Sequence, residues 1–106
     1  MRDYELVMVL SPAVGDEGVP ATVDRVSGFI QERGGEVTQV DQWGKRRLAY
    51  PIRSQLEAYY VVTQFKMDPQ AVRALEGNLD LAEDVMRHLV VRLEEEPKKQ
   101  ESPGGV

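Results

Sequence analysis

The fold of this chain is decided near its middle, by the ten residues Ala58-Tyr59-Tyr60-Val61-Val62-Thr63-Gln64-Phe65-Lys66-Met67. Aromatic and β-branched side chains dominate this stretch, which predicts a strand. Asp68-Pro69 follows at once, and an acid before a proline at the first helical position predicts that a helix begins there. The stripe that this helix buries is expected to be Val72, Leu75 and Leu79.

The residues before this strand predict its hairpin partner. From Glu36 to about Ile52 the chain is rich in Val, Thr, Gln, Trp and Tyr, and Gly44 interrupts the pattern as a bulge or sharp bend does. Ser54 to Glu57 is short and polar, so it is expected to join the two strands. On the third strand, one face is expected to carry Tyr59, Val61, Thr63, Phe65 and Met67. The opposite face, with Tyr60, Val62 and Gln64, is moderately apolar and favours a protein partner.

Three further elements complete the pattern. Tyr4, Leu6, Met8 and Leu10 alternate with other residues as one face of a first strand does. A helix is predicted from near Asp16 or Pro20 to Gly34-Gly35, with Val19, Val23, Val26 and Ile30 at helical spacing. A fourth strand is predicted over Val85 to Leu93. Its inward face is either Leu89-Val91 or Met86-His88-Val90, because both parities are apolar.

The predicted order of elements, β-α-β-β-α-β, defines an α+β, ferredoxin-like fold: a four-stranded antiparallel sheet with two helices on one face. With 106 residues and 42% hydrophobic content, the chain is expected to form one domain, residues 1–93. Residues 94–106 are acidic and polar with two prolines, which predicts a disordered tail. The chain has no cysteine, no signal-peptide pattern and no apolar run of about 20 residues, so a cytoplasmic protein without membrane contact is expected.

The sequence contains few residues in patterns that could catalyse a reaction. His88 is the single histidine, and no glycine-rich loop has phosphate-binding spacing. His88 is therefore expected to be a half-buried strand residue. The neighbouring carboxylates Glu83-Asp84 lack the spacing of calcium-loop ligands. No catalytic residue, metal site, cofactor or small-molecule substrate is expected.

A basic strip, Gly44-Lys45-Arg46-Arg47-Leu48-Ala49-Tyr50-Pro51-Ile52-Arg53, contains four of the thirteen basic residues and no acid, in a chain of net charge -5. Without those four, nine basic residues face eighteen acidic ones, so the rest of the surface repels polyanions. Lys and Arg neutralise phosphates, and the arginine fork can also grip a base edge. Two interpretations remain: RNA binding, or an edge strand protected by charge against aggregation.

Two flat rings favour the RNA interpretation. Trp43 and Tyr50 bracket the strip and can stack on unpaired bases, although Trp43 could equally be a core residue. Single charges also lie on the first and last strands, at Arg2, Arg87 and Arg92. Each of these is more often a solvated strand residue than a ligand.

Over nearly its whole predicted domain the chain resembles bacterial small-subunit ribosomal protein S six (S6). The resemblance rests on Met1-Arg2-x-Tyr4-Glu5, Leu10-x-Pro12, Val85-Met86-Arg87 and above all Gly44-x-Arg46-Arg47-Leu48-Ala49-Tyr50-Pro51-Ile52-Arg53. It implies a ferredoxin-like fold and a structural role in the small ribosomal subunit. It also implies binding to the central domain of the small-subunit rRNA, as a heterodimer with ribosomal protein S eighteen (S18).

By position, the resemblance makes Lys45, Arg46, Arg47 and Arg53 RNA or partner contacts, followed by Arg2 and Arg87. Some family members end in an acidic tail extended by added glutamates, whereas this chain ends Pro103-Gly104-Gly105-Val106.

Two alternatives on the same fold remain. An RNA recognition motif-like module, or another ferredoxin-like binding module, would need a basic-glycine-aromatic pattern that Ala58 to Phe65 lacks. An acylphosphatase-like hydrolase would need a glycine-rich loop with an arginine after the first strand, and Ser11-Pro12-Ala13-Val14-Gly15 has none.

Overall fold

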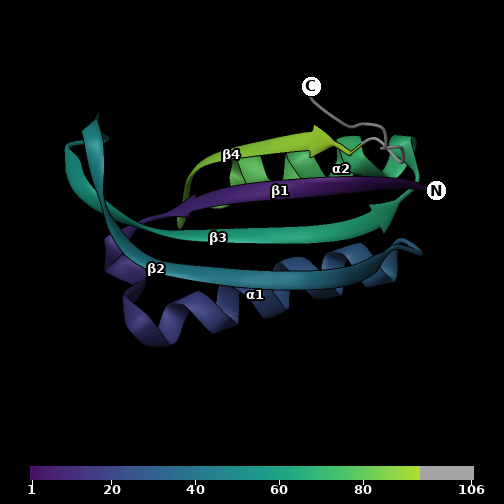
Figure 1. Ribbon diagram of the computed structural model, residues 1–106, viewed down its shortest axis with the longest axis horizontal. Coiled ribbons are helices and arrows are strands. Elements are labelled where there is room, and N and C mark those ends of the chain that lie inside the picture. The colour runs from purple at the N-terminus through teal and green to yellow at the C-terminus, as the bar shows by residue number, and fades with distance from the viewer. Residues whose placement is uncertain (94–106) are drawn as a thin grey trace, which may run out of the picture.

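The computed structural model describes residues 1–93, in which one antiparallel sheet has the strand order β2-β3-β1-β4. Both helices cover the same face of this sheet (Figure 1). The predicted α+β, ferredoxin-like arrangement is confirmed. The predicted tail, residues 94–106, lies outside the described residues. In chain order the elements are β1 Arg2–Leu10, the short 3-10 helix η1 Pro12–Val14, α1 Gly15–Glu32, β2 Glu36–Ile52, β3 Gln55–Met67, α2 Pro69–Leu81 and β4 Val85–Arg92.

The core lies between the sheet and the helices, and period-two alternation selects its strand residues. Tyr4 of β1 stacks on Phe65 of β3, with ring centroids 5.5 Å apart. Both rings are buried, whereas Lys66, one residue away on the opposite face, is exposed. The predicted inward faces of β1, β3 and both helices are all confirmed. The buried residues are Tyr4, Leu6, Met8 and Leu10 from β1; Tyr59, Val61, Thr63, Phe65 and Met67 from β3; and Val19, Val23, Val26, Ile30, Val72, Leu75 and Leu79 from the helices.

The ends of the helices follow the expected signals with one difference. After α1, Gly34 adopts the left-handed φ of 83° and its N–H bonds to the Gln31 carbonyl, as expected of a helix-ending glycine. Asp68 precedes α2 as predicted, but its side chain makes no capping hydrogen bond. Its carboxylate lies 3.8 Å from the N-terminal ammonium, and its backbone carbonyl accepts the N–H groups of Ala71 and Val72 instead.

A bulge decides which face of β4 turns inward. Val9 pairs with Arg87 but Leu10 pairs with Val85, so β4 has one extra residue at this point. The parity of β4 therefore changes at the bulge: His88 and Val90 follow Met8 and Leu6 on the helix side. Met86 packs on the helix-free face. The prediction of Met86-His88-Val90 as the inward face is therefore confirmed for His88 and Val90 and wrong for Met86.

The hairpin between β2 and β3 turns more tightly than predicted. Ile52 pairs with Gln55, so the loop is Arg53-Ser54 alone and Gln55 to Glu57 belong to the strand, not to the loop. Both loop residues have positive φ, 51° and 67°, as a two-residue type I′ turn requires. Arginine and serine give a weak local signal for this turn, because the left-handed region favours glycine, asparagine and aspartate.

Replacing Ser54 by glycine is expected to raise the free energy of unfolding by about 0.5 kcal/mol. The left-handed conformation costs a residue with a Cβ roughly 1–2 kcal/mol, and the larger unfolded-state entropy of glycine offsets part of the gain. Urea unfolding followed by circular dichroism measures the change. Ser54→Ala is the control, because it removes the hydroxyl and keeps the Cβ; a gain in this variant equal to that of glycine would contradict the explanation.

Asp84, in the loop between α2 and β4, ties three segments together. Its carboxylate accepts hydrogen bonds from Thr22 at 2.9 Å and from Arg25 at 3.1 Å, and its backbone carbonyl accepts the N–H of Ser11. Burial by itself would raise the pKa of Asp84, but the hydrogen bonds from Arg25 and Thr22 outweigh it, so that the pKa lies below its ordinary value of 3.8. The charged form of Asp84 therefore stabilises the fold.

This network predicts a pH-dependent effect of Asp84→Asn. At pH 7 the variant is expected to lower the free energy of unfolding by about 1 kcal/mol. The loss is no larger because Arg25 is half exposed and solvent weakens its pair with Asp84. Since the folded-state pKa is lowered, the contribution is complete above about pH 4 and disappears as the pH falls through the lowered pKa. The difference between the two proteins in urea unfolding should shrink toward pH 2.5, whereas a constant difference would show that the charge is not its source.

Candidate nucleic-acid interface

The basic strip lies on an arm of the β2–β3 hairpin that extends past the rest of the sheet. Tyr59 of β3 pairs with Leu10, the last residue of β1, and on its other side with Lys45. Residues 46–58, called here the hairpin arm, consequently have no third strand beside them. In Figure 1 the arm curls away beyond the ends of β1 and β4. This leaves most of the strip open to solvent.

Gly44 sets the orientation of Trp43 at the root of the arm. The register of β2 shifts between Gln42 and Gly44, and Gly44 has a φ of 84°, so the predicted bend is confirmed. Trp43 is placed on the helix-free face, where its ring stacks on Tyr60 at 6.3 Å between centroids. Its indole N–H donates to Asp41 at 3.1 Å, and 47% of the residue remains exposed. Trp43 is thus a surface ring and not a core residue.

Three cations lie at the root of the arm, two of them over aromatic rings. The Lys45 ammonium lies 5.7 Å from the centroid of Tyr59, and the Arg46 guanidinium lies at the same distance from Trp43. Arg47 is exposed and pairs across the ladder with Glu57. Within residues 1–93, none of the three cations forms an ion pair with a carboxylate. Their charge is therefore available to an external anion.

The tyrosine under Lys45 is bound to the first turn of α1. The Tyr59 hydroxyl donates to the Asp16 carboxylate at 2.7 Å. This hydrogen bond to an anion raises the pKa of Tyr59 above its ordinary value, so the phenol keeps its proton at neutral pH. The ring beneath Lys45 is consequently a neutral surface on which the ammonium rests.

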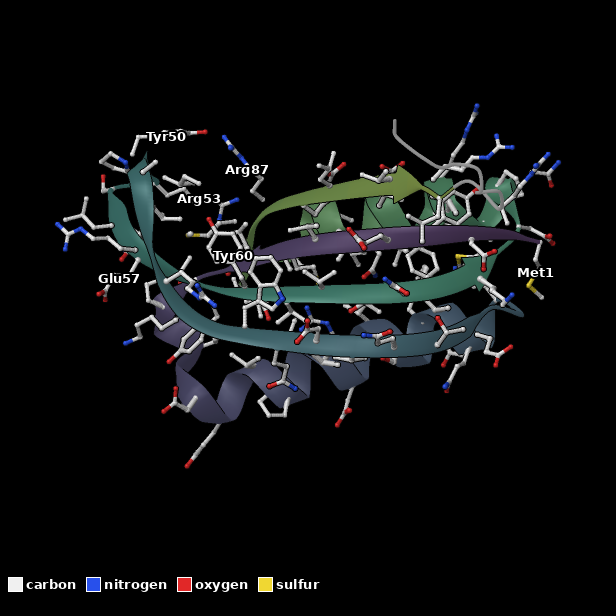
Figure 2. The ribbon with its side chains drawn as sticks, viewed as in Figure 1. Met1, Tyr50, Arg53, Glu57, Tyr60 and Arg87 are labelled. Carbon is white, nitrogen blue, oxygen red and sulfur yellow. The ribbon has the colours of Figure 1, made fainter. Side chains whose placement is uncertain are left out.

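The two remaining arginines near the arm bond to residues far away in the sequence, whereas Arg46 donates to the carbonyl of its near neighbour Trp43 at 3.3 Å. Arg87 of β4 donates to the Tyr50 hydroxyl at 2.8 Å, and Arg53 donates to the Glu83 carbonyl at 3.3 Å. Figure 2 shows Tyr50, Arg53 and Arg87 gathered at one end of the molecule. The structure therefore unites six of the eight predicted contacts along the arm and its root, with Arg87 approaching from β4. The six are Trp43, Lys45, Arg46, Arg47, Tyr50 and Arg53.

Arg2 lies elsewhere. It pairs with Met67, at the end of β3 farthest from the arm, and the labelled Met1 and Tyr50 stand at opposite ends in Figure 2. A ligand on the arm and a ligand on Arg2 would be separated by the length of the sheet.

A second small core under the arm was not predicted from the sequence. Leu48 and Ala58 of the arm are buried against Val9 and Met86 on the helix-free face of the sheet. The available signal was Leu48 itself, an apolar residue in the middle of a basic strip. This cluster joins the arm to β1 and β4.

The described residues offer no sign of catalytic or metal chemistry. Among residues 1–93 no three His, Cys, Asp or Glu side chains lie close enough to hold a metal ion. His88 is half-buried as expected, with its Nε2 3.7 Å from an Asp80 carboxylate oxygen on α2. None of the helices in this part of the chain has the length and hydropathy to cross a membrane. Fold and surface together define a small α+β protein that carries one exposed basic hairpin.

Comparison with known proteins assigns the chain to a family. Residues 3–92 match the family model of ribosomal protein S6. The chain is 46% identical over 96 residues to small ribosomal subunit protein bS6 of Moorella thermoacetica, covering 91% of this chain and 98% of that one. It is 42% identical over 95 residues to the same protein of Caldanaerobacter subterraneus, covering 90% and 100%. The crystal structure of 30S ribosomal protein S6 from Thermotoga maritima superposes with a TM-score of 0.82 at 31% identity, covering 87% of each chain.

The chain belongs to the ribosomal protein S6 family. It is accordingly a structural, non-enzymatic protein of the small ribosomal subunit, as the sequence predicted.

Proposed function

We propose that this chain binds the central domain of the small-subunit rRNA together with ribosomal protein S18, as one half of a heterodimer in the cytoplasm. The observation that carries the RNA contact is the group Lys45, Arg46 and Arg47, three cations without ion-pair partners in residues 1–93. They lie at the root of an arm that extends past the sheet of an acidic protein. Such a group neutralises phosphates, while the surrounding negative charge confines RNA to the arm.

The ring of Trp43 offers a contact to a base of the RNA, beside the contacts with its phosphates. Its exposed indole lies beside Arg46, so an unpaired base can stack there while the arginines hold the backbone. Of the other RNA or partner contacts predicted from the sequence, Arg2 lies in a separate region of the surface, and Tyr50, Arg53 and Arg87 lie at or beside the arm.

A protein partner fits the helix-free face of the sheet. Leu89 and Val91 of β4 are exposed there at 59% and 41%, and Val62 of β3 is only half buried. Apolar side chains at this density on one face of a sheet are normally covered in the assembled state. This supports S18 as a partner that binds alongside the RNA.

The RNA recognition motif-like alternative is weaker on this geometry. That module stacks bases on exposed rings of its central strands. On the corresponding face of β3 the described ring is Tyr60, and it is covered by Trp43. Base stacking at the hairpin root is therefore favoured over stacking on the sheet centre.

The proposal predicts that the isolated chain binds rRNA weakly. Three phosphate contacts, from Lys45, Arg46 and Arg47, on a protein of net charge -5 should give a Kd of about 10⁻⁵ M or weaker at physiological salt, as non-specific electrostatic binding does. Addition of S18 should raise the affinity for a central-domain fragment by roughly 100-fold, because two linked surfaces then bind one RNA. Filter binding with and without S18, over a salt series, measures both values. Nanomolar binding by the chain alone would contradict the proposed sharing.

A further inference from the structure

The hairpin arm needs support that two strands cannot supply. A two-stranded ribbon is marginally stable by itself in water, and residues 46–58 have no third strand. The ladder within the arm is also interrupted: Arg47 pairs with Glu57, and the next pair is Ile52 with Gln55. Four residues of β2 thus lie opposite a single residue of β3. The arm bows outward there, and contacts from outside the hairpin must hold its shape.

The turn at the end of the arm adds a conformational cost. Arg53 and Ser54 both adopt left-handed φ values without being glycine. Each such residue persists only where surrounding contacts favour the conformation. The side chain of Arg53 provides one of these contacts, through its hydrogen bond to the Glu83 carbonyl in the loop before β4.

The second contact joins the bowed segment to β4. Arg87 donates to the Tyr50 hydroxyl at 2.8 Å, and its guanidinium carbon lies 5.8 Å from the centroid of the same ring. Between them, Arg53 and Arg87 connect the arm to the loop before β4 and to β4 itself. Leu48 of the arm adds an apolar contact, because it is buried in one cluster with Val9 and Met86.

From these contacts we infer that Arg87 and Tyr50, with Arg53, form a clasp that holds the hairpin arm in its curled shape, and that Arg87 is a positioning residue and not a phosphate contact. The guanidinium of Arg87 bonds within the protein, to the hydroxyl of Tyr50 on the arm. Lys45, Arg46 and Arg47 are the cations left to face the RNA, in a geometry that the clasp fixes before binding. This inference rests on the proposed function for its binding step, but the closed arm is a property of the free chain.

Two single variants separate the clasp from an RNA contact. Tyr50→Phe removes the acceptor and keeps the ring, and Arg87→Met removes the donor and the charge. Each is expected to weaken binding of the full chain with S18 to a central-domain rRNA fragment by roughly 3- to 10-fold, because a smaller fraction of molecules has the arm closed. The double variant should lose no more than the larger single effect, since both remove the same hydrogen bond. The dependence of affinity on salt should be unchanged, because no phosphate contact is lost.

Hydrogen exchange of the free chain tests the clasp without RNA. Both single variants should speed amide exchange in residues 46–58 while leaving exchange in β1 and α1 unchanged. Arg92→Met is the matched control: it removes the same charge from an exposed position on the same strand, and within residues 1–93 Arg92 has no side-chain hydrogen bond or ion pair. It should change neither exchange nor affinity.

Two results would overturn the inference. One is an Arg87→Met variant whose salt slope falls by about one while Tyr50→Phe binds normally, which would make Arg87 a phosphate contact. The other is unchanged exchange in the arm of both variants. Neither result touches the proposed function, which would fail instead if reversing the charges of Arg46 and Arg47 left RNA binding intact.

Discussion

Reversing two charges, with Arg46→Glu and Arg47→Glu together, is expected to weaken assembly of this chain with S18 onto central-domain rRNA by roughly 100-fold or more. Each lost phosphate contact removes counterion release, and each new carboxylate repels the backbone it faces. Both side chains are exposed and form no ion pair within residues 1–93. The variant loses the contact of Arg46 with Trp43 and places a carboxylate opposite Glu57, so the free energy of unfolding should fall by only about 1 kcal/mol. Filter binding over a salt series and urea unfolding measure the two quantities.

The control for this variant must carry the same net charge. Arg33→Glu with Arg73→Glu meets that condition, because both arginines are exposed on the helical side of the molecule, away from the arm. The control should bind RNA within about twofold of the unaltered chain once salt screens long-range repulsion. Equal losses in the two double variants would show that net charge, and not the arm, governs binding.

Removing the central aromatic ring is expected to have the largest effect on stability. Phe65 is 1% exposed, and its ring stacks on Tyr4. Phe65→Ala leaves a cavity in the core and should therefore lower the free energy of unfolding by about 3–5 kcal/mol. Such a loss is a large fraction of the 5–15 kcal/mol that typically stabilises a domain. Urea unfolding at neutral pH measures it.

The neighbouring residue supplies the control for this second variant. Lys66→Ala changes the opposite face of the same strand, where the ammonium lies 3.3 Å from Asp3 in a partly exposed pair. Its cost should stay below about 1 kcal/mol. If both variants were equally destabilising, the alternation of buried and exposed residues along β3 would not describe where its stability comes from.

The main core, between the sheet and the helices, was predictable because its residues follow local patterns of spacing in the sequence. Phe65 lies in a run of alternating apolar residues, and Val23 and Val26 recur at helical spacing in the segment that Gly34-Gly35 ends. These signals involve residues within a few positions of one another. β4 shows the limit of such signals: apolar residues on both parities allowed either face, and the bulge opposite Val9 and Leu10 decided between them.

The candidate site was predictable in composition but not in arrangement. The density of Lys45, Arg46 and Arg47 in an acidic chain marks the strip, and Gly44 marks the bend before it. Nothing near Tyr50 in the sequence indicates Arg87, which lies 37 positions away and reaches it only because β4 passes beside the arm.

Local pattern was therefore sufficient for the order of elements, the inward faces of β1 and β3, and the place where positive charge collects. These follow from side-chain periodicity and backbone preference, which depend on near neighbours alone. Three features are decided only by the tertiary structure. They are the turn at Arg53-Ser54, the small core around Leu48, and the hydrogen bonds of Arg53 and Arg87 to other elements. Each of these depends on segments brought together by the sheet, and a contact between distant segments can impose on a residue a conformation or partner that its neighbours do not favour.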